Sequence, residues 1–362
     1  MKRYNLERRE LVQRIRKEFP AVVPIILAFD DCRVEVRTNS PHLAETLREY
    51  FSDFLADGSE GDMLVTAHEA VAPEFSELFA PKAPEPGKSK IKEEFIELGD
   101  GRVVRKLLTG MVFMFGGDES LAIGPCMANA NQVINFINNR FISWKLRQGC
   151  LLGHAAGVGL HGRGLALAGF SGMGKSTLAL HLMSRGTDFV SNDRVLIRED
   201  GDGLFMYGVA KLPRINPGTA LNNPDLLGVI PPEEREQFVG LAPDVLWSLE
   251  HKYDVFIDRC FGPGRFSLAA PMEGLVVLNW QRGPAPTVVR EVDIRLRRDL
   301  LPAFMKSAGL FFLPEHGEEI DHSEEAYVTR LEKTRVFEVS GGIDFDRACH
   351  ACLGILDEGC DH

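Results

Sequence analysis

Residues 169–176 are Gly-Phe-Ser-Gly-Met-Gly-Lys-Ser, and this octapeptide constrains the fold more than any other feature of the chain. It fits the pattern G-x-x-x-x-G-K-[ST], in which glycines let successive backbone N–H groups turn inward onto phosphate oxygens. An apolar run at 165–168 precedes it and an apolar segment at 177–183 follows it. We therefore expect a buried strand, a phosphate-binding loop (P-loop) and a helix whose N-terminus also attracts anions.

The polar positions of this loop have distinct expected roles. The Lys175 ammonium is expected to reach the β- and γ-phosphates of a nucleotide, and the Ser176 hydroxyl to ligate Mg²⁺. The loop thus predicts ATP and Mg²⁺ as cofactors. The residues expected to bind the nucleotide belong to the loop and the first helical turn: Gly169, Ser171, Gly172, Met173, Gly174, Lys175, Ser176 and Thr177.

The bulk composition narrows the class of partner. The chain has 362 residues, 44% of them hydrophobic and 26% charged, which suits two or three globular domains. Its net charge of -11 would repel a nucleic acid, although a local basic pocket can still hold a nucleotide. No apolar run approaches the roughly 18 residues of a membrane span, so we expect neither nucleic acid nor membrane as a partner.

Cysteine usage and the N-terminus indicate the compartment. Most of the seven cysteines are scattered singly, which is typical of a reducing environment. The apolar run at 21–29 contains Pro24, which predicts a buried strand rather than a signal peptide. We therefore expect a cytoplasmic protein. Cys349 and Cys352 form an isolated CxxC, which without a second pair is expected to lie on a helix rather than hold a metal.

The pattern along the chain predicts three regions. Residues 1–80 have the mixed signals of a smaller N-terminal α+β region, including a Ser40-Pro41 helix start. Residues 81–93 are rich in proline and lysine and predict a linker or exposed loop. Residues 94–362 are expected to form the P-loop domain, with a β-rich entry segment and C-terminal helices. Strands and helices alternate after residue 150, which predicts an α/β core with a mixed sheet.

A resemblance to a known family appears around the loop. His154 stands upstream of it, Arg185-Gly186 follows the helix, and Phe-Val-Ser-Asn-Asp-Arg-Val occupies 189–195. Together with the loop, residues 154–197 resemble the HPr kinase/phosphorylase family, and within it the HPr-kinase-related kinases, including the subgroup called kinase B. The resemblance implies a core like that of phosphoenolpyruvate carboxykinase and transfer of a phosphoryl group from ATP to a serine on a partner protein.

The same resemblance implies roles for individual residues. By position, Gly169–Thr177 would hold the nucleotide, His154 would lie near the transferring phosphate, and Asp193 would be an active-site carboxylate. The family forms hexamers, which implies a homo-oligomer. The glycine-rich motif that the family carries after its core has no match near residue 255, which puts the reverse, phosphate-removing activity in doubt.

Asn192 departs from the family pattern, which has an acid there. An amide cannot take a proton from a hydroxyl nucleophile and gives Mg²⁺ no charge. Either Asp193 alone carries the remaining role, or the base comes from elsewhere. Asp193 also follows an apolar run, which is where an acid that faces bound Mg²⁺ stands at a strand end. The alternative is a structural role, in which Asp193 pairs with Arg194 or caps a turn. His154 has the alternative of a buried structural histidine.

Other charged residues are candidate contacts for phosphate or substrate. Asp258 follows a short apolar run at 255–257 that predicts a strand, and it is either a second metal ligand or a surface acid. Basic side chains can stabilise charge on a moving phosphoryl group. The candidate contacts are Asn192, Arg194, Lys211, Arg214, Asp258 and Arg259, with Arg265 as a further arginine.

Three functions fit these residues. The first is Mg²⁺/ATP-dependent transfer to a protein serine, in which Lys175 and Ser176 bind the nucleotide and Asp193 serves as base or metal ligand with the help of His154. The second is a kinase for a small molecule. The third is a catalytically reduced nucleotide-binding module, which the Asn192 substitution favours. The acceptor itself is not specified by the sequence.

Overall fold

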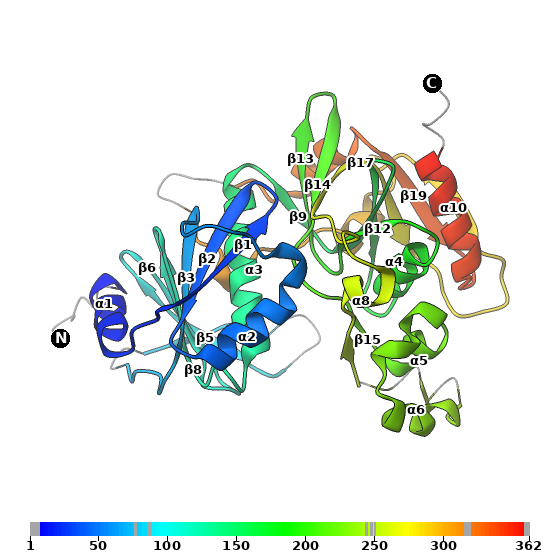
Figure 1. The fold of residues 1–362 in the computed structure, drawn as a ribbon. Helices are drawn as coiled ribbons and strands as arrows, with labels where there is room; N and C mark the ends of the chain where they lie inside the picture. Colours follow the sequence, from blue (N-terminus) through cyan, green and yellow to red (C-terminus); the bar gives the residue numbers. More distant parts are fainter. Residues whose placement is uncertain are drawn as a thin grey trace. The chain divides into compact units, whose positions relative to one another are not determined.

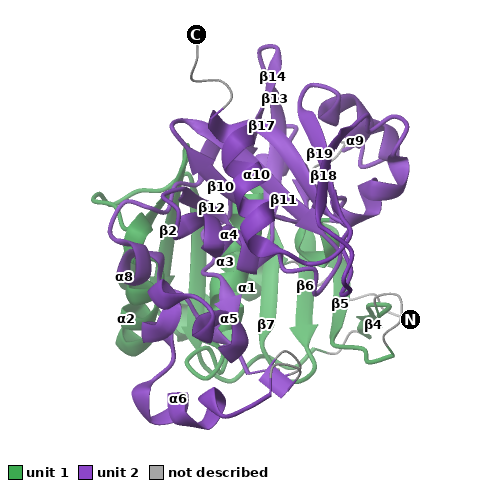
Figure 2. Ribbon diagram, turned by 90° about the vertical axis from the view of Figure 1, so that its right-hand side faces the viewer, with its two compact units in different colours: residues 1–144, 308–319 green, residues 145–307, 320–362 purple. Residues whose placement is uncertain are grey.

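The computed structural model describes residues 8–75, 78–84, 89–242, 245–246, 249, 251–314 and 320–357. The chain forms two compact units, coloured separately in Figure 2. Unit 1 comprises residues 1–144 and 308–319, and unit 2 comprises residues 145–307 and 320–362. Each unit is built on its own large β-sheet.

Unit 1 has an eight-stranded sheet with the order β1-β2-β3-β8-β7-β6-β5-β4. Strands β2, β3 and β8 run parallel and the remaining pairs are antiparallel. The strands are β1 (Val23–Phe29), β2 (Cys32–Thr38), β3 (Met63–Glu69), β4 (Ala80–Pro81), β5 (Glu93–Leu98), β6 (Gly101–Lys106), β7 (Val112–Gly116) and β8 (Glu119–Gly124). The helices are α1 (Arg8–Glu18), α2 (Pro41–Tyr50), η1 (Ser52–Phe54), α3 (Ala130–Arg147) and η4 (Gly309–Phe311).

Local signals in unit 1 act as the sequence predicts. The Ser40 side chain accepts a hydrogen bond from the Leu43 N–H at 3.2 Å, and Pro41 occupies the first turn, so α2 begins where its cap residues stand. The run at 21–29 contributes β1, which confirms a strand there. No helix in the described part of the chain has the length and apolar character needed to cross a membrane.

The compact units differ from the predicted division of the chain. The proposed linker, residues 81–93, begins in β4 and ends in β5, two antiparallel neighbours in one sheet, and its residues 85–88 lie outside the described part of the chain. Strand β8 pairs in parallel with β3, so the strands after the linker complete the sheet that the first 80 residues begin. Unit 1 consequently continues to Trp144. Long-range parallel pairing leaves no local sequence signal, which is why composition pointed to the proline-rich stretch instead.

Unit 2 has a nine-stranded mixed sheet, which confirms the predicted α/β class. Its strands are β9 (Leu151–Gly153), β10 (Ala155–Leu160), β11 (Arg163–Gly169), β12 (Asp188–Ser191), β13 (Val195–Asp200), β14 (Gly203–Tyr207), β17 (Ala269–Leu278), β18 (Val288–Val292) and β19 (Arg335–Ser340). A separate pair joins β15 (Arg214–Ile215) to β16 (Tyr253–Asp254). The helices are α4 (Lys175–Met183), α5 (Pro217–Leu221), η2 (Pro224–Val229), α6 (Pro232–Val239), α8 (Ile257–Phe261), η3 (Arg298–Ala303), α9 (Glu324–Leu331) and α10 (Phe345–Asp357).

Strand β17 is the centre of this sheet. It pairs in parallel with β11 on one side, and on the other side with β14 along its first half and β19 along its second half. Because β11, β17 and β19 run in parallel, their carboxyl ends meet at one edge of the sheet, the edge at which ligands bind in open α/β folds. The glycine-rich loop leaves β11 at this edge.

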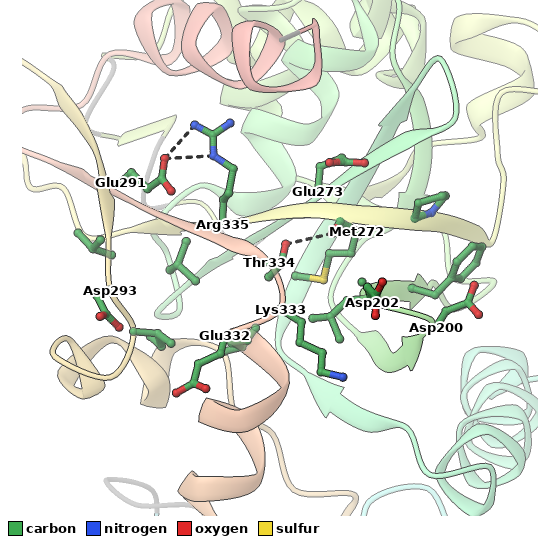
Figure 3. Close-up of a pocket in the computed structure, with 18 of the residues that line it drawn as sticks. Asp200, Asp202, Met272, Glu273, Glu291, Asp293, Glu332, Lys333, Thr334 and Arg335 are labelled. Carbon is green, nitrogen blue, oxygen red and sulfur yellow. Dashed lines mark hydrogen bonds and ion pairs between the residues drawn. The ribbon is translucent and has the colours of Figure 1, made fainter. Parts of the chain in front are cut away.

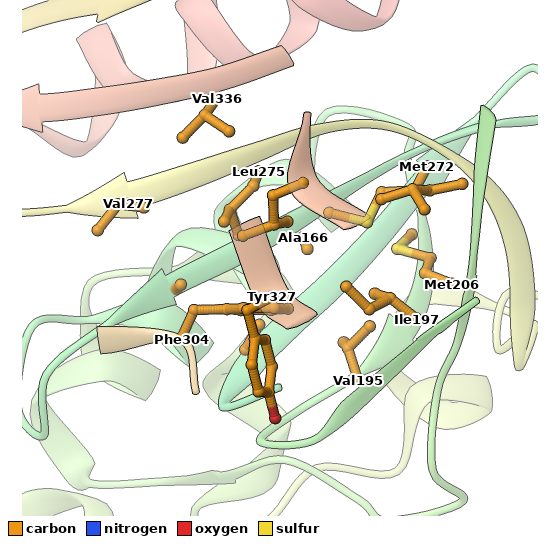
Figure 4. Close-up of a cluster of buried hydrophobic side chains, with 14 of the residues drawn as sticks. Ala166, Val195, Ile197, Met206, Met272, Leu275, Val277, Phe304, Tyr327 and Val336 are labelled. Carbon is orange, nitrogen blue, oxygen red and sulfur yellow. The ribbon is translucent and has the colours of Figure 1, made fainter. Parts of the chain in front are cut away.

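The two faces of the sheet are covered differently. Helices α4 and α10 pack against each other and against β11, near one another in Figure 1. The opposite face carries a hydrophobic cluster that includes Ala166, Ala168, Phe304 and Tyr327 (Figure 4). Alternation of side chains along β11 supplies both faces, because the strand is apolar throughout 165–168. Cys349 and Cys352 are buried on α10, as predicted for the isolated CxxC.

Candidate active site

The loop between β11 and α4 turns back on itself rather than continuing in an extended form. Gly172 has a φ of 83° and Gly174 a φ of 88°, in the left-handed region that glycine adopts without steric cost. A Cβ on Gly174 would stand 2.8 Å from the Phe345 ring, so a side chain there would also collide with α10. The Trp280 indole donates to the Met173 carbonyl at 2.9 Å and fixes the loop from outside.

Lys175 closes the base of the loop. Its ammonium donates to the Gly169 carbonyl at 2.7 Å and to the Phe170 carbonyl at 3.4 Å, and the residue is only 8% exposed. Burial lowers the pKa of Lys175, and the Lys306 charge adds to this, while the Asp193 charge opposes it. An ammonium that is costly to bury and lines a cavity is well suited to an anionic ligand.

The first turn of α4 places two hydroxyls beside partners from other segments. The Ser176 hydroxyl donates to the Asn192 amide oxygen at 2.7 Å. The Thr177 and Thr219 hydroxyl oxygens lie 3.4 Å apart. Asn192, the departure from the family pattern, therefore contacts the very hydroxyl that is expected to ligate Mg²⁺.

His154 and Asp193 meet although 38 residues separate them in the sequence numbering. His154 Nε2 lies 3.3 Å from the Asp193 carboxylate. The backbone N–H of His154 donates to the Phe304 carbonyl at 2.6 Å, and this bond fixes the position of His154 just after β9. Asp193 lies between β12 and β13, and His154 lies between β9 and β10. Because β10 pairs with β12 and β9 pairs with β13, these two strand junctions bring the predicted catalytic pair together.

Positive charge surrounds this carboxylate. Burial alone would raise the pKa of Asp193, but the hydrogen bond from His154 and the charges of Lys211, Lys306 and Arg194 outweigh it and hold the pKa below its usual range. Burial in turn lowers the pKa of Lys211, against the attraction of Asp193. Asp193 is therefore ionised at neutral pH, and it faces several cations within an acidic protein.

One cavity of about 400 Å³ brings most of the predicted residues together. Its described lining comprises His154, Ser171, Gly172, Gly174, Lys175, Ser176, Thr177, Asn192, Asp193, Lys211, Arg214, Ile215, Asn216, Thr219 and Lys252. Arg194 is not part of this lining, but its Nε lies 3.9 Å from the Asp193 carboxylate. Gly169 and Met173 are not part of this lining: the Gly169 carbonyl accepts from the Lys175 ammonium, and the Met173 carbonyl accepts from the Trp280 indole.

Sequence reasoning missed several residues of this site. Thr219 and Lys252 line the cavity, and the Lys306 charge acts on both Lys175 and Asp193. Of these residues, only Thr219 lies next to a sequence signal, the Asn-Pro pair that starts a helix. Asn216 caps α5 by accepting a hydrogen bond from the Thr219 N–H at 3.2 Å. The two lysines come from distant segments without a motif.

Asp258 and Arg259 are not among the residues that line the cavity. The predicted strand at 255–257 is wrong, because β16 ends at Asp254 and α8 begins at Ile257. The Arg259 guanidinium lies 4.0 Å from the centre of the Phe256 ring. Apolar runs this short fit a strand and a helix equally well, which explains the misassignment. Arg265 binds Asp188 at 2.6 Å instead of a phosphate-facing group.

A larger cavity of about 870 Å³ lies elsewhere in unit 2 (Figure 3). Both arginines in its described lining are paired with acids of the same lining: Arg335 binds Glu291 at 2.8 Å, and Arg295 binds Asp293 at 2.6 Å. Among the described residues that line it, none belongs to the glycine-rich loop. Size alone therefore does not mark the functional site, and the smaller cavity carries the chemistry.

Known proteins share part of this sequence. The chain is 35% identical over 82 residues to an HPr kinase/phosphorylase of Exiguobacterium sibiricum, a match that covers 23% of this chain and 24% of the relative. It is 36% identical over 84 residues to the enzyme of the same name from another Exiguobacterium, covering 23% and 25% of the two chains. The chain carries an HPr kinase-like segment. A third HPr kinase/phosphorylase, from Chlorobium phaeovibrioides, is 36% identical over 73 residues and 20% of each chain.

The HPr kinase-like likeness is partial. The chain spans about a quarter or less of the length of the curated relatives it matches. No protein-family model matches the chain. The solved HPr(Ser) kinase/phosphatase of Coxiella burnetii aligns with 58% of this chain and 89% of its own length, with 13% identity and a TM-score of 0.30. The kinase B subgroup and the phosphoenolpyruvate carboxykinase type of core stay predictions.

Proposed function

We propose that this chain is an ATP-dependent kinase that transfers the γ-phosphoryl group to a serine hydroxyl on a partner protein. One observation carries the proposal: the loop lysine Lys175, the hydroxyl of Ser176 and the His154–Asp193 pair all face the same cavity of about 400 Å³. The partial likeness to HPr kinase/phosphorylases supports the same reaction class.

The nucleotide phosphates would lie against the loop. The N-terminus of α4 supplies unpaired N–H groups and the positive end of the helix dipole. Lys175 would exchange its bonds to the Gly169 and Phe170 carbonyls for bonds to the β- and γ-phosphates. Lys211 and Arg214, which also line the cavity, would offset charge on the phosphoryl group as it moves.

The donor set fits Mg²⁺, which takes oxygen ligands and usually keeps few from the protein because phosphates and water supply the others. The Ser176 hydroxyl and the Asn192 amide oxygen are 2.7 Å apart, and the Asp193 carboxylate lines the same cavity. Ser176 and Asp193 would hold the ion, with Asn192 beside them. When bound, Mg²⁺ would neutralise charge on the phosphate oxygens.

Asp193 and His154 would act on the acceptor. Their contact at 3.3 Å lets one orient the other, and either can accept the serine proton as the phosphoryl group is transferred. Asp193 stays ionised because His154 and the cations around it lower its pKa, so it can accept a hydrogen bond from the incoming hydroxyl at neutral pH. Exposed Ser171, Arg214 and Lys252 on the cavity lining support a protein acceptor, which needs an accessible rim.

A catalytically reduced nucleotide-binding module is the second candidate. Asn192 stands where the family has an acid and accepts a hydrogen bond from Ser176 without offering a charge. This arrangement retains nucleotide binding while weakening the hold on Mg²⁺. The two candidates differ in whether any phosphoryl group leaves the nucleotide.

Transfer of the γ-phosphoryl group tests the proposal directly. Extract of the source cells would be incubated with γ-labelled ATP and wild-type protein, Asp193→Asn or Asp200→Asn, an exposed acid outside the cavity that serves as the matched control. We expect a labelled protein band with phosphoserine from wild type and the control, and a loss of about 10²-fold or more with Asp193→Asn. Label in a small molecule would support a metabolite kinase, and ATP binding without transfer would support the module.

A further inference from the structure

A third cavity, of about 750 Å³, adjoins the phosphate-facing cavity of about 400 Å³. We call it the apolar cavity; it is lined chiefly by His181, Leu221, Leu227, Val239, Leu246 and Phe345. The two cavities share four lining residues, Gly174, Thr177, Asn216 and Thr219. A ligand that enters one can therefore extend into the other past the Thr177–Thr219 hydroxyls.

The order of groups along the two cavities matches the order of groups in a nucleotide. His154 and Asp193 line only the phosphate-facing cavity, Lys175 and Ser176 follow, and Thr177 stands at the junction. In a loop of this type the lysine reaches the β- and γ-phosphates. A triphosphate with its γ end toward Asp193 would consequently have its nucleoside beyond Thr177, where the apolar cavity begins.

We propose that the apolar cavity holds the base and ribose of the nucleotide whose phosphates the loop binds, an inference that rests on the proposed function. The His181 and Phe345 rings stack with centroids 5.5 Å apart and planes 13° apart, so α4 and α10 present aromatic surface to the cavity. Aliphatic side chains from α5, η2 and α6 complete the lining. This is a surface for a flat, weakly polar ring and not for a second anion.

Polar groups in the lining fit a base as well. Arg235 is held by bonds from its guanidinium to the Leu227 carbonyl at 2.6 Å and the Ile230 carbonyl at 3.3 Å. Its buried Nε has no acceptor among the described residues, and ring nitrogens of a base are acceptors. Burial lowers the pKa of His181, assisted by the Arg185 charge and opposed by Asp346, so its imidazole is neutral when it stacks.

A comparison of ATP with tripolyphosphate tests this assignment, because tripolyphosphate has the three phosphates of ATP without its base and ribose. Calorimetric titrations with Mg²⁺ would compare ATP and tripolyphosphate on wild-type protein, Val239→Asp and Leu241→Asp. Val239 lines the apolar cavity and is 67% exposed, so a carboxylate there does not threaten folding. Leu241 is 36% exposed, lies two residues away and is not part of the lining, which makes it the matched control.

We expect wild type to bind ATP at least about tenfold more tightly than tripolyphosphate, the factor that 1.4 kcal/mol of apolar burial supplies. Val239→Asp should reduce ATP affinity several-fold and leave tripolyphosphate affinity unchanged, and Leu241→Asp should change neither. His181→Ala, which removes the stacked ring, should act like Val239→Asp. Equal binding of the two ligands by wild type, or equal weakening of both by Val239→Asp, would overturn the assignment. If neither ligand binds, the proposed function itself fails.

Discussion

The loop after β11 and the hydrophobic cluster packed against β11 differ in how well their buried polar groups are stabilised. In the core, Tyr327 is 1% exposed and its hydroxyl donates to the Leu152 carbonyl at 2.6 Å, so the buried polar atom is satisfied. In the loop, Lys175 is nearly as deeply buried, but its charge is destabilised there, as its lowered pKa indicates. The core is arranged for stability, and the loop keeps an unfavourable charge that a phosphate can use.

This contrast predicts that function and stability can be changed separately. Substitutions in the loop should affect ligand binding and transfer with little loss of stability. Substitutions in the core should do the reverse. The variants below separate the two regions, starting with the largest expected effect.

Lys175→Met removes the buried ammonium and keeps an unbranched side chain. Transfer should fall by about 10²- to 10³-fold, as loss of a charge-stabilising donor does. Because burial lowers the lysine pKa, its protonated form is disfavoured in the fold at every pH below the unfolded pKa. The thermal midpoint should therefore stay constant or rise. Lys92→Met, at an exposed position, is the control. A clear fall in the thermal midpoint of Lys175→Met would contradict the proposed separation of function from stability.

Leu331→Ala tests the core. Leu331 is fully buried in the cluster that covers the face opposite α4. Its truncation should lower the free energy of unfolding by about 3 kcal/mol through lost burial and a cavity. ATP affinity of the folded variant should match wild type, whereas Leu296→Ala, at an 82% exposed position, should change neither quantity. Chemical denaturation and calorimetry measure both; loss of ATP binding by folded protein would contradict the separation.

The lowered lysine pKa values predict an alkaline limit to binding. Burial lowers the pKa of Lys211 below the ordinary value of 10.5, so its positive charge is present at neutral pH and disappears as the pH rises through the lowered value. ATP affinity should then fall by about tenfold, the worth of one charged hydrogen bond, before pH 10.5 is reached. Lys211→Arg should move this fall to higher pH, because guanidinium keeps its proton. An unchanged profile would remove Lys211 from the binding groups.

Asn192→Asp should have the smallest effect. The carboxylate would still accept the Ser176 hydroxyl, so ATP affinity at saturating Mg²⁺ should stay within about threefold of wild type. The concentration of Mg²⁺ needed for half-maximal binding should fall, because the ion gains a charged neighbour. Titrations at graded Mg²⁺ measure both quantities. A large loss of ATP affinity would show that Asn192 does not lie beside the metal.

Sequence reasoning predicted what local patterns specify. The loop, the strand before it and the helix after it follow from glycine positions and apolar runs, and β11 and α4 confirm those two elements. Family spacing pointed to His154 and Asp193, which the structure brings within 3.3 Å. Lys306, by contrast, reaches the site from a segment more than 100 residues beyond Asp193 and has no motif of its own.

The apolar cavity and the unit boundary were missed for a related reason. The cavity arises where α4, α10 and the α5–α6 segment meet, and each contributes ordinary apolar residues whose meeting only the fold determines. Strand β8 likewise pairs in parallel with β3, and parallel pairing between strands so far apart in the sequence has no turn motif that would predict it. Asp258 shows the opposite error, in which a short apolar run suggested a strand and the chain forms α8.

Hydrogen exchange of the backbone amides tests the central claim most directly. The peptide that covers residues 169–183 would be followed with and without Mg²⁺·ATP, in wild type and in Lys175→Met. We predict that ATP slows exchange at the loop amides and the first turn of α4 in wild type, because those N–H groups bind phosphate, and that the variant loses this protection. Unchanged exchange in this peptide, with ATP protecting a different part of the chain, would contradict the account.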